Sequence, residues 1–262
     1  MSARIEQAFA RARGEGRSAL VAYLTAYDGG HAHSLACLRA VADAGADVIE
    51  LGVPFSDPTA DGPAIQAAMG RALAAGATLP RVLELAAELR AVCDVPIVLF
   101  GYGNPIVRMG PEAFAASAAE HGADAVLVVD LPAEASAFVR APVRTAGLDW
   151  IGLVAPTTTP ERLGRILAVT TGFLYAITLR GVTGAALGEE AADAELRAQV
   201  DRIRSLSELP IAAGFGVRGP AQARRLAWCD GVVVGSALVE AGVRGPAALV
   251  EDVRALREAL VR

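Results

Sequence analysis

The stretch Asp47-Val-Ile-Glu-Leu-Gly-Val-Pro-Phe-Ser-Asp-Pro-Thr-Ala-Asp-Gly-Pro-Ala-Ile-Gln66 joins a strand-like segment to a loop rich in proline, glycine and aspartate. Residues 47–51 form an apolar run of strand length that encloses one carboxylate, Glu50. The loop that follows adds Asp57 and Asp61, and Pro63 suits the first turn of a helix. A strand that carries a carboxylate to its C-terminal end, followed by an acidic loop, is typical of acid–base sites in parallel α/β proteins.

Glu50 has two interpretations. A charge in an apolar strand is costly unless it is paired or neutralised, and burial raises the pKa of a carboxyl group toward the range useful for proton transfer. Glu50 is equally consistent with one half of a buried ion pair, and Asp57 with a residue that braces a turn. Strand and loop alone do not decide between these interpretations.

Apolar segments of strand length alternate with helical patterns along nearly the whole chain. Eight strands are predicted, at residues 18–25, 47–52, 96–101, 125–129, 150–154, 172–177, 210–213 and 231–234. Helices are predicted at residues 5–13, 34–44, 64–93 with a break near 76–80, 111–121, 133–146 and 246–261. Three further helices are predicted: one that begins at residue 160, one that runs from about residue 191 to residue 206, and a short one that begins near residue 220. This alternation predicts an α/β fold, a single (β/α)8 TIM barrel with an extra N-terminal helix.

Nothing divides the chain into separate parts. No linker or low-complexity tract interrupts the alternation, so residues 1–262 are expected to form one domain. The sequence Gly-Ala-Asp recurs at residues 45–47 and 122–124, where predicted helices turn into strands. We interpret this recurrence as repeated turn chemistry and not as a repeat family.

Composition excludes several classes of protein. Hydrophobic residues make up 53% of the chain, yet no apolar run approaches the ~18 residues of a membrane span. The N-terminal segment is charged throughout and lacks the apolar core of a secretory signal, which indicates a cytoplasmic protein. The net charge of -5 gives no support for nucleic-acid binding.

Cysteine and histidine usage indicates neither disulfides nor a metal site. Cys37, Cys93 and Cys229 are odd in number and far apart, as expected of reduced thiols. His31 and His33 lie close in sequence, but no further cysteine or histidine follows at a recognisable ligand spacing. No metal ligand is therefore predicted.

A barrel of this type carries its site at the C-terminal ends of the strands. Glycines follow the last two predicted strands, in Gly214-Phe-Gly216 and Gly235-Ser236, where backbone amides and a short helix N-terminus can bind a phosphate. Each glycine pair alone fits an ordinary tight turn, and their joint occurrence favours a phosphate site. Other strand ends supply an apolar wall, although each residue alone fits core packing equally well: Tyr23, Phe100, Leu127, Tyr175 and Phe215.

Several motifs, in one order across nearly the whole chain, resemble the tryptophan synthase alpha subunit family. The first is long and highly specific, whereas the glycine pairs would mean little on their own. The motifs are Glu50-Leu-Gly-Val-Pro-Phe-Ser-Asp-Pro-Thr-Ala-Asp-Gly-Pro63, Gly101-Tyr-Gly-Asn-Pro105, Asp130-Leu-Pro132, Gly181-Val-Thr-Gly184, Gly214-Phe-Gly216 and Gly235-Ser-Ala237.

The resemblance implies a carbon–carbon lyase that cleaves indole-3-glycerol phosphate to indole and glyceraldehyde 3-phosphate. It implies that Glu50 moves protons at the indole C3 and the glycerol hydroxyl, and that Asp61 stabilises the protonated ring nitrogen. No metal or organic cofactor is needed for this reaction. The substrate-binding residues that it implies are Tyr23, Phe100, Tyr102, Leu127, Tyr175, Thr183, Gly184, Phe215, Gly216, Gly235 and Ser236.

The family also implies a partner, a pyridoxal-phosphate-dependent beta subunit that receives indole within an alpha2-beta2 complex and makes L-tryptophan. The loops after strands two and six would close over the substrate and face that partner. This chain differs there from bacterial members. It has Thr178-Leu179 where they usually carry Ser-Arg, its Arg180 directly precedes Gly181, and Thr59 replaces the usual Leu.

Three other functions stay open. A stand-alone lyase that releases free indole would use the same residues and differ in loop behaviour. A catalytically idle barrel that regulates a partner is disfavoured because Glu50 and Asp61 are both present. A sugar-phosphate isomerase or epimerase is disfavoured by the long first motif and the lack of metal ligands.

Overall fold

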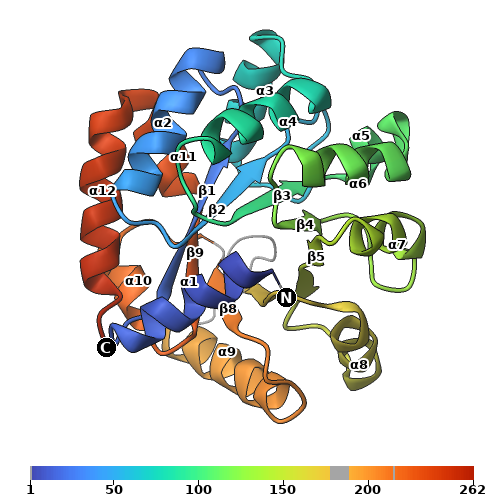
Figure 1. The fold of residues 1–262 in the computed structure, drawn as a ribbon. Coiled ribbons are helices and arrows are strands. Elements are labelled where there is room, and N and C mark those ends of the chain that lie inside the picture. The colour runs from blue at the N-terminus through green and yellow to red at the C-terminus, as the bar shows by residue number, and fades with distance from the viewer. Residues whose placement is uncertain (1, 178–188, 215) are drawn as a thin grey trace.

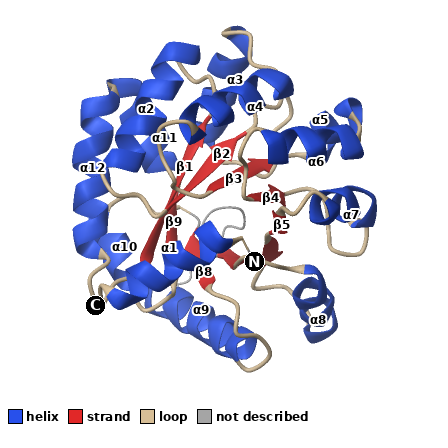
Figure 2. Cartoon of the chain, viewed as in Figure 1, coloured by secondary structure: helices blue, strands red, loops and turns tan. Residues whose placement is uncertain are grey.

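The structure, a computed structural model, describes residues 2–177, 189–214 and 216–262. Its strands are all parallel and follow the order β5-β4-β3-β2-β1-β9-β8-β7-β6 in one sheet. Helices surround this sheet, as Figures 1 and 2 show. The strands are β1 (Ala19–Thr25), β2 (Val48–Gly52), β3 (Ile97–Gly101), β4 (Ala125–Val128), β5 (Asp149–Trp150), β6 (Gly152–Val154), β7 (Leu174–Ile177), β8 (Ile211–Gly214) and β9 (Gly231–Val234).

The predicted extra helix at the N-terminus is present as α1, before β1, and the other helices of the described residues lie between and after the strands. None of them combines the length and apolar character needed to cross a membrane. Their bounds are α1 (Ala3–Gly14), α2 (His31–Asp43), α3 (Pro63–Ala74), α4 (Leu79–Arg90), α5 (Gly103–Met109), α6 (Pro111–Glu120), α7 (Ala137–Thr145), α8 (Pro160–Val169), α9 (Glu189–Arg204), α10 (Pro220–Leu226), α11 (Ser236–Arg244) and α12 (Pro246–Ala259).

The barrel closes through a strand that changes its neighbour. The prediction of one uninterrupted strand at residues 150–154 is wrong, because this segment forms β5, which pairs with β4, and β6, which pairs with β7. Ile151 lies between the two and donates its N–H to the carbonyl of Val126 at 3.0 Å. The two ends of the sheet are therefore consecutive pieces of one chain segment, and the predicted (β/α)8 barrel is confirmed.

Two helices were not predicted, and a third starts later than predicted. Helix α5 begins in a Gly-Asn-Pro sequence that is typical of a loop, and α11 follows β9 without a loop between them. Helix α7 begins at Ala137 and not at residue 133. Residues 132–135 form a turn instead, in which the Ser136 hydroxyl donates to the carbonyl of Ala133 at 3.0 Å.

Alternate residues of the strands build two separate cores. One set packs between the sheet and the outer helices. The other set fills the barrel interior together with Ile5, Ala8, Phe9 and Ala12 of α1. Helix α1 lies across the sheet in Figure 1, and its Phe9 ring packs on that of Phe173 at 5.4 Å between centroids. Helix α1 thus closes the end of the barrel opposite the C-terminal ends of the strands.

The recurring Gly-Ala-Asp turn ties neighbouring strands together. The Asp47 carboxylate accepts a hydrogen bond from the Leu20 N–H, and the Asp124 carboxylate accepts one from the Ile97 N–H, each at 2.9 Å. In both cases the aspartate precedes a strand and bonds to the start of the strand before it. The turn chemistry inferred from the sequence is therefore a bond that fixes register at the amino-terminal end of the barrel.

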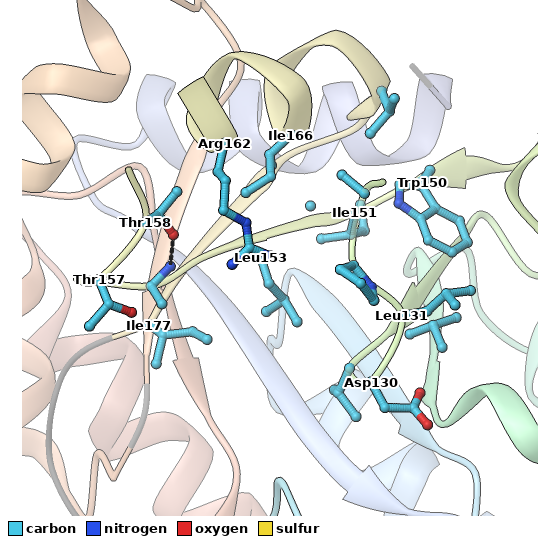
Figure 3. A pocket seen from close by; sticks show the side chains of 17 residues that line it. Asp130, Leu131, Trp150, Ile151, Leu153, Thr157, Thr158, Arg162, Ile166 and Ile177 are labelled. Atoms are coloured by element: carbon cyan, nitrogen blue, oxygen red, sulfur yellow. Dashed lines mark hydrogen bonds between the residues drawn. The ribbon is translucent and has the colours of Figure 1, made fainter. Parts of the chain in front are cut away.

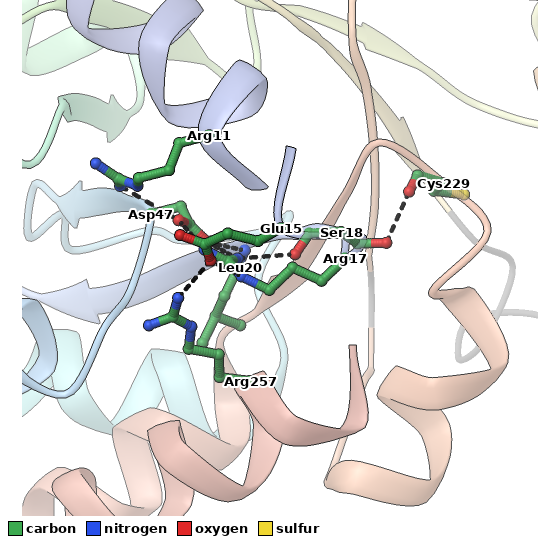
Figure 4. A network of polar contacts seen from close by, with 8 residues as sticks. All are labelled: Arg11, Glu15, Arg17, Ser18, Leu20, Asp47, Cys229 and Arg257. Carbon is green, nitrogen blue, oxygen red and sulfur yellow. Dashed lines mark hydrogen bonds and ion pairs between the residues drawn. The ribbon is translucent and has the colours of Figure 1, made fainter. Parts of the chain in front are cut away.

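A buried ion pair reinforces the same end (Figure 4). The Arg17 guanidinium donates to both carboxylate oxygens of Asp47, and both side chains are almost wholly buried. Arg17 also contacts Glu15, which Arg257 of α12 contacts in turn at 2.7 Å. The network joins the first helix, the first two strands and the last helix. Removal of one member of such a buried pair leaves the other charge uncompensated.

We predict that Asp124→Ala destabilises the fold by about 3–5 kcal/mol. Asp124 accepts hydrogen bonds from the Ile97 N–H at 2.9 Å and from Arg90 at 2.7 Å, and both donors would lose a buried acceptor. Urea denaturation followed by circular dichroism measures the change. Asp94→Ala is the control, because that side chain is 97% exposed, and we expect it to change stability by less than about 0.5 kcal/mol. Equal effects of the two substitutions would contradict this account.

Candidate active site

Glu50 lies on β2 with its side chain in the barrel interior. Its exposed fraction is 1%, and Oε1 is buried without a hydrogen-bond partner among the described residues. No described basic side chain forms an ion pair with it, so the alternative of a buried ion pair finds no support among these residues. Burial raises the pKa of Glu50 to about 8. A carboxyl group in this setting is largely protonated at neutral pH and can exchange its proton.

Two tyrosines flank this carboxyl group. Tyr23 of β1 lies opposite Glu50 in the strand register, and its hydroxyl lies 3.3 Å from that of Thr25. Burial raises the pKa of Tyr23 and of Tyr175 well above the ordinary value, and the negative charges of Glu50 and Asp61 raise both further. The two carboxylates and the two phenol rings therefore belong to one electrostatically coupled site.

Asp61 comes from the loop after β2 and is held by Tyr102. The Tyr102 hydroxyl donates to Asp61 Oδ2 at 2.6 Å and accepts from the Ala60 N–H at 3.1 Å. The Tyr102 ring also stacks on Phe55, with centroids 5.0 Å apart. Burial raises the pKa of Asp61, and the hydrogen bond from Tyr102 lowers it in part because it favours the charged form. The two carboxyl groups thus differ in environment: among the described residues Glu50 Oε1 has no donor, whereas Asp61 accepts a hydrogen bond from Tyr102.

Sequence reasoning placed Tyr102 among the substrate-binding residues. In the structure its side chain is buried and its hydroxyl is engaged by Asp61 and Ala60 of the loop. That arrangement gives Tyr102 a role in positioning Asp61. Contact of Tyr102 with a substrate stays a prediction.

The predicted apolar wall forms beside Glu50. The rings of Tyr23 and Phe100 meet edge to face, with centroids 5.2 Å apart, and Leu127 pairs with Phe100 in the register of β3 and β4. Gly52 makes room for the first ring, since a Cβ there would lie 2.3 Å from the Tyr23 hydroxyl. Tyr175 completes the wall as part of the interior core.

The predicted wall did not include one further layer of apolar residues. Val129, Leu153 and Ile177 are partly buried and pack against the interior core, one step closer to the C-terminal ends of the strands. Each lies two residues beyond an interior residue of its own segment, and successive side chains of a strand alternate between its faces. The period of two would have identified them. Ile65 of α3 was also missed; like Phe100, it packs against the cluster of Tyr23, Ala68 and Val239.

The glycines predicted to bind phosphate lie at neighbouring strand ends. Gly214 ends β8 and pairs with Val233 of β9, so it lies near Gly235 at the start of α11. The first bond within α11 runs from the Val239 N–H to the Gly235 carbonyl at 2.9 Å. The N–H groups of residues 236–238, Ser236 included, therefore have no acceptor within the helix.

Gly216 adopts a left-handed φ of +74°, which favours glycine there. Together with the start of α11, the backbone at Gly216 is suited to an anion. The predicted site residues Thr183, Gly184 and Phe215 lie outside the described residues, as do Thr178, Leu179 and Arg180.

The two histidines considered as metal ligands have different partners. His31 contacts Glu88 at 3.0 Å, and His33 contacts the carbonyl of Gly242 at 2.9 Å and the sulfur of Cys37 at 3.3 Å. Within the described part of the chain, no three histidine, cysteine, aspartate or glutamate side chains are grouped as a metal site would require. The three cysteines are free.

Comparison with known proteins places this chain. Residues 9–259 match the family model described as tryptophan synthase alpha chain. The chain is 47% identical over 239 residues to the tryptophan synthase alpha chain of Dechloromonas aromatica, a match that covers 90% of this chain and 88% of that protein. With the tryptophan synthase alpha chain of Gluconacetobacter diazotrophicus the identity is 48% over 238 residues, which covers 90% of this chain and 86% of that protein.

Solved structures of tryptophan synthase are similar to this chain in fold and sequence. Tryptophan synthase subunit alpha from Legionella pneumophila has a TM-score of 0.89 at 34% identity, and the match covers 99% of this chain and 98% of that one. A chain of tryptophan synthase from Mycobacterium tuberculosis has a TM-score of 0.91 at 35% identity, with 100% of both chains covered. The chain therefore belongs to the tryptophan synthase alpha chain family.

Proposed function

We propose that this chain cleaves indole-3-glycerol phosphate to indole and glyceraldehyde 3-phosphate, with Glu50 and Asp61 as the catalytic residues. One observation carries the proposal. Glu50 is buried in the barrel interior with no hydrogen-bond partner for Oε1 among the described residues, beside an apolar wall and on the same side of the barrel as the glycines that suit a phosphate. A retro-aldol cleavage of a flat apolar group from a phosphorylated polyol requires these three parts together.

Glu50 is suited to move a proton in both directions. With its pKa raised to about 8, the carboxyl group can donate a proton to the indole C3. As a carboxylate it can then accept the proton of the glycerol hydroxyl, while the bond between C3 and the glycerol carbon breaks. The electron pair of that bond returns to the ring, the glycerol carbon becomes the aldehyde, and Glu50 is protonated again.

Asp61 would stabilise the positive charge that C3 protonation places on the ring nitrogen. Its hydrogen bond from Tyr102 favours the carboxylate form that this task requires. Two carboxyl groups in one site would thus take different protonation states, because Asp61 accepts the hydrogen bond from Tyr102 whereas Glu50 Oε1 is buried without a donor from the described residues.

The remaining predicted residues divide between the two ends of the substrate. Tyr23, Phe100, Leu127 and Tyr175 would contact the indole ring. Gly216, Gly235 and Ser236 would bind the phosphate through backbone N–H groups. Thr183, Gly184 and Phe215 are proposed for the same pocket on the family resemblance alone.

The family name implies a beta subunit as the partner that takes up indole to make L-tryptophan. An alpha2-beta2 assembly, pyridoxal phosphate in the partner and a cytoplasmic location are part of this proposal. We also propose a single domain over residues 1–262. The pairing of β1 with β9 supports it, because this pairing joins strands from near the two ends of the chain. A stand-alone lyase differs only in its response to the partner.

We predict that Glu50→Gln lowers indole release from indole-3-glycerol phosphate at least about 10²-fold, because glutamine cannot transfer a proton. The assay uses the purified chain with and without a tryptophan synthase beta subunit. Glu120→Gln, which removes an exposed carboxylate from the end of α6, is the control and should act like the parent. Activity of Glu50→Gln within a few-fold of the parent would refute the assignment. Fast turnover by the parent that the beta subunit leaves unchanged would identify a stand-alone lyase.

We predict that Tyr102→Phe shifts the acidic limb of the kcat/KM profile toward higher pH. Loss of the hydroxyl removes the hydrogen bond that lowers the pKa of Asp61, while the burial that raises it remains. A larger fraction of Asp61 is then protonated below neutral pH, and activity recovers as the pH rises. Tyr27→Phe is the matched control, because Tyr27 is a buried tyrosine whose ring packs against that of His31, with centroids 5.5 Å apart. A loss of the same size at every pH would indicate a merely structural role.

A further inference from the structure

The loops at the C-terminal ends of the strands carry an unbalanced set of charges. Arg218, between β8 and α10, is the only basic residue of these loops in the described part of the chain. The acidic residues that the structure describes in the same loops are Asp28, Asp57, Asp61, Asp130 and Glu134. The loops therefore carry an excess of negative charge, as does the whole chain with its net charge of -5.

Two of these carboxylates are neutralised by arginines of neighbouring helices. Asp28 accepts two hydrogen bonds from Arg71 of α3, each at 2.7 Å. Glu134 pairs with Arg162 of α8 at 3.2 Å and lies 3.7 Å from Arg165. These helical arginines are therefore already engaged with acidic partners.

The three other loop aspartates accept hydrogen bonds only from neutral donors among the described residues. Asp130, for example, accepts the Gly103 N–H at 2.8 Å. Figure 3 shows the pocket that Asp130 and Arg162 both line, and there the Asp130 carboxylate lies apart from the Arg162 guanidinium. A phosphate ester, with a charge of roughly -1.5 to -2 at pH 7, is repelled by such carboxylates.

Arg218 places a positive charge next to a glycine that suits a phosphate. It follows Gly216 by two residues, so the two Cα atoms lie no more than about 7 Å apart. Val217 between them is buried, whereas Gly216 and Arg218 are both exposed. The Arg218 N–H donates to Gln222 Oε1 at 2.6 Å, which fixes the backbone at this point. The Arg218 guanidinium forms no ion pair with a described residue, so its charge can act on an anion.

The separation of Arg218 from Gly216 is short enough for this charge to act on a phosphate without touching it. The Debye length is about 10 Å at 0.1 M ionic strength, which exceeds the separation of the two Cα atoms. A charge beside a site raises the local concentration of oppositely charged ligands and their rate of association. This effect weakens steeply as the ionic strength rises.

We propose that Arg218 attracts the phosphate of the substrate to the site. The proposal rests on the proposed function, which supplies a phosphorylated substrate. Backbone N–H groups at Gly216 and at the start of α11 would hold the phosphate, and Arg218 would offset its repulsion by the loop aspartates. Arg218 thus acts on binding and not on cleavage of the carbon–carbon bond.

Binding of inorganic phosphate to the purified chain tests this role without turnover. ³¹P NMR follows a fixed, low concentration of phosphate as protein is added, at about 0.01 M ionic strength, where the Debye length is ~30 Å. We expect Arg218→Gln to weaken the affinity at least about threefold, since one charge acts on a dianion through water. Arg218→Lys retains the charge and should retain most of the affinity.

Arg13→Gln is the matched control. Arg13 is an exposed arginine of α1, at the opposite end of the barrel, and its loss changes the net charge of the chain equally. We expect this variant to bind phosphate like the parent, with the folds of all variants checked by circular dichroism.

Salt separates the effect of a charge from a structural role. At about 1 M salt the Debye length falls to ~3 Å, and the difference between Arg218→Gln and the parent should disappear. In the lyase assay at low salt, Arg218→Gln should raise KM at least about threefold with kcat unchanged.

Four results would overturn the proposal: no phosphate binding by the parent, equal effects of Arg218→Gln and Arg13→Gln, equal losses in Arg218→Gln and Arg218→Lys, or a loss that persists at high salt. Phosphate is added directly, so absence of lyase turnover would count only against the proposed function.

Discussion

The proposed chemistry depends on a carboxyl group, Glu50, that the fold buries and whose Oε1 has no hydrogen-bond partner in the described part of the chain. Burial raises the pKa of Glu50 from an ordinary 4.5 to about 8, so at ~1.4 kcal/mol per pKa unit the ionised form is disfavoured by roughly 5 kcal/mol. Folding therefore favours the protonated group. Its contribution to stability is complete below about pH 4.5 and is lost as the pH rises through about 8. The free-energy cost of ionising Glu50 therefore falls at the position where the proposed chemistry needs a proton donor.

Stabilising hydrogen bonds lie at one end of the barrel and the candidate active site lies at the other. At the amino-terminal end, Asp47 and Asp124 have several donors each, and α1 closes the interior with the contact between Phe9 and Phe173. These bonds hold the strands in register without any ligand. At the other end, Glu50 Oε1 has no donor within residues 2–177, 189–214 and 216–262, and the first backbone amides of α11 have no acceptor within that helix. The hydrogen bonds at the amino-terminal end thus stabilise a barrel whose other end can keep polar groups of the candidate site free of protein partners.

The alternation of apolar runs and helical patterns was enough to predict the barrel, the extra N-terminal helix and the position of Glu50 on a strand. Such patterns report on local periodicity and burial. They do not report which neighbour a strand chooses, so the change of partner at Ile151 was not predicted. Similarly, the bond between Tyr102 and Asp61 joins residues 41 apart in sequence, and no local signal marks it. Residues 178–188 and Phe215 carry predictions that lie outside the described structure.

The most direct test of this account is the pKa of the Glu50 carboxyl group itself. It can be measured by ¹³C NMR titration of the side-chain carboxyl carbon, with the signal assigned by its absence in Glu50→Gln. The account predicts a midpoint of about 8 in the folded chain without ligand. A midpoint near the ordinary 4.5 would show that water or a donor reaches this carboxylate, and the proton donor proposed here would not exist.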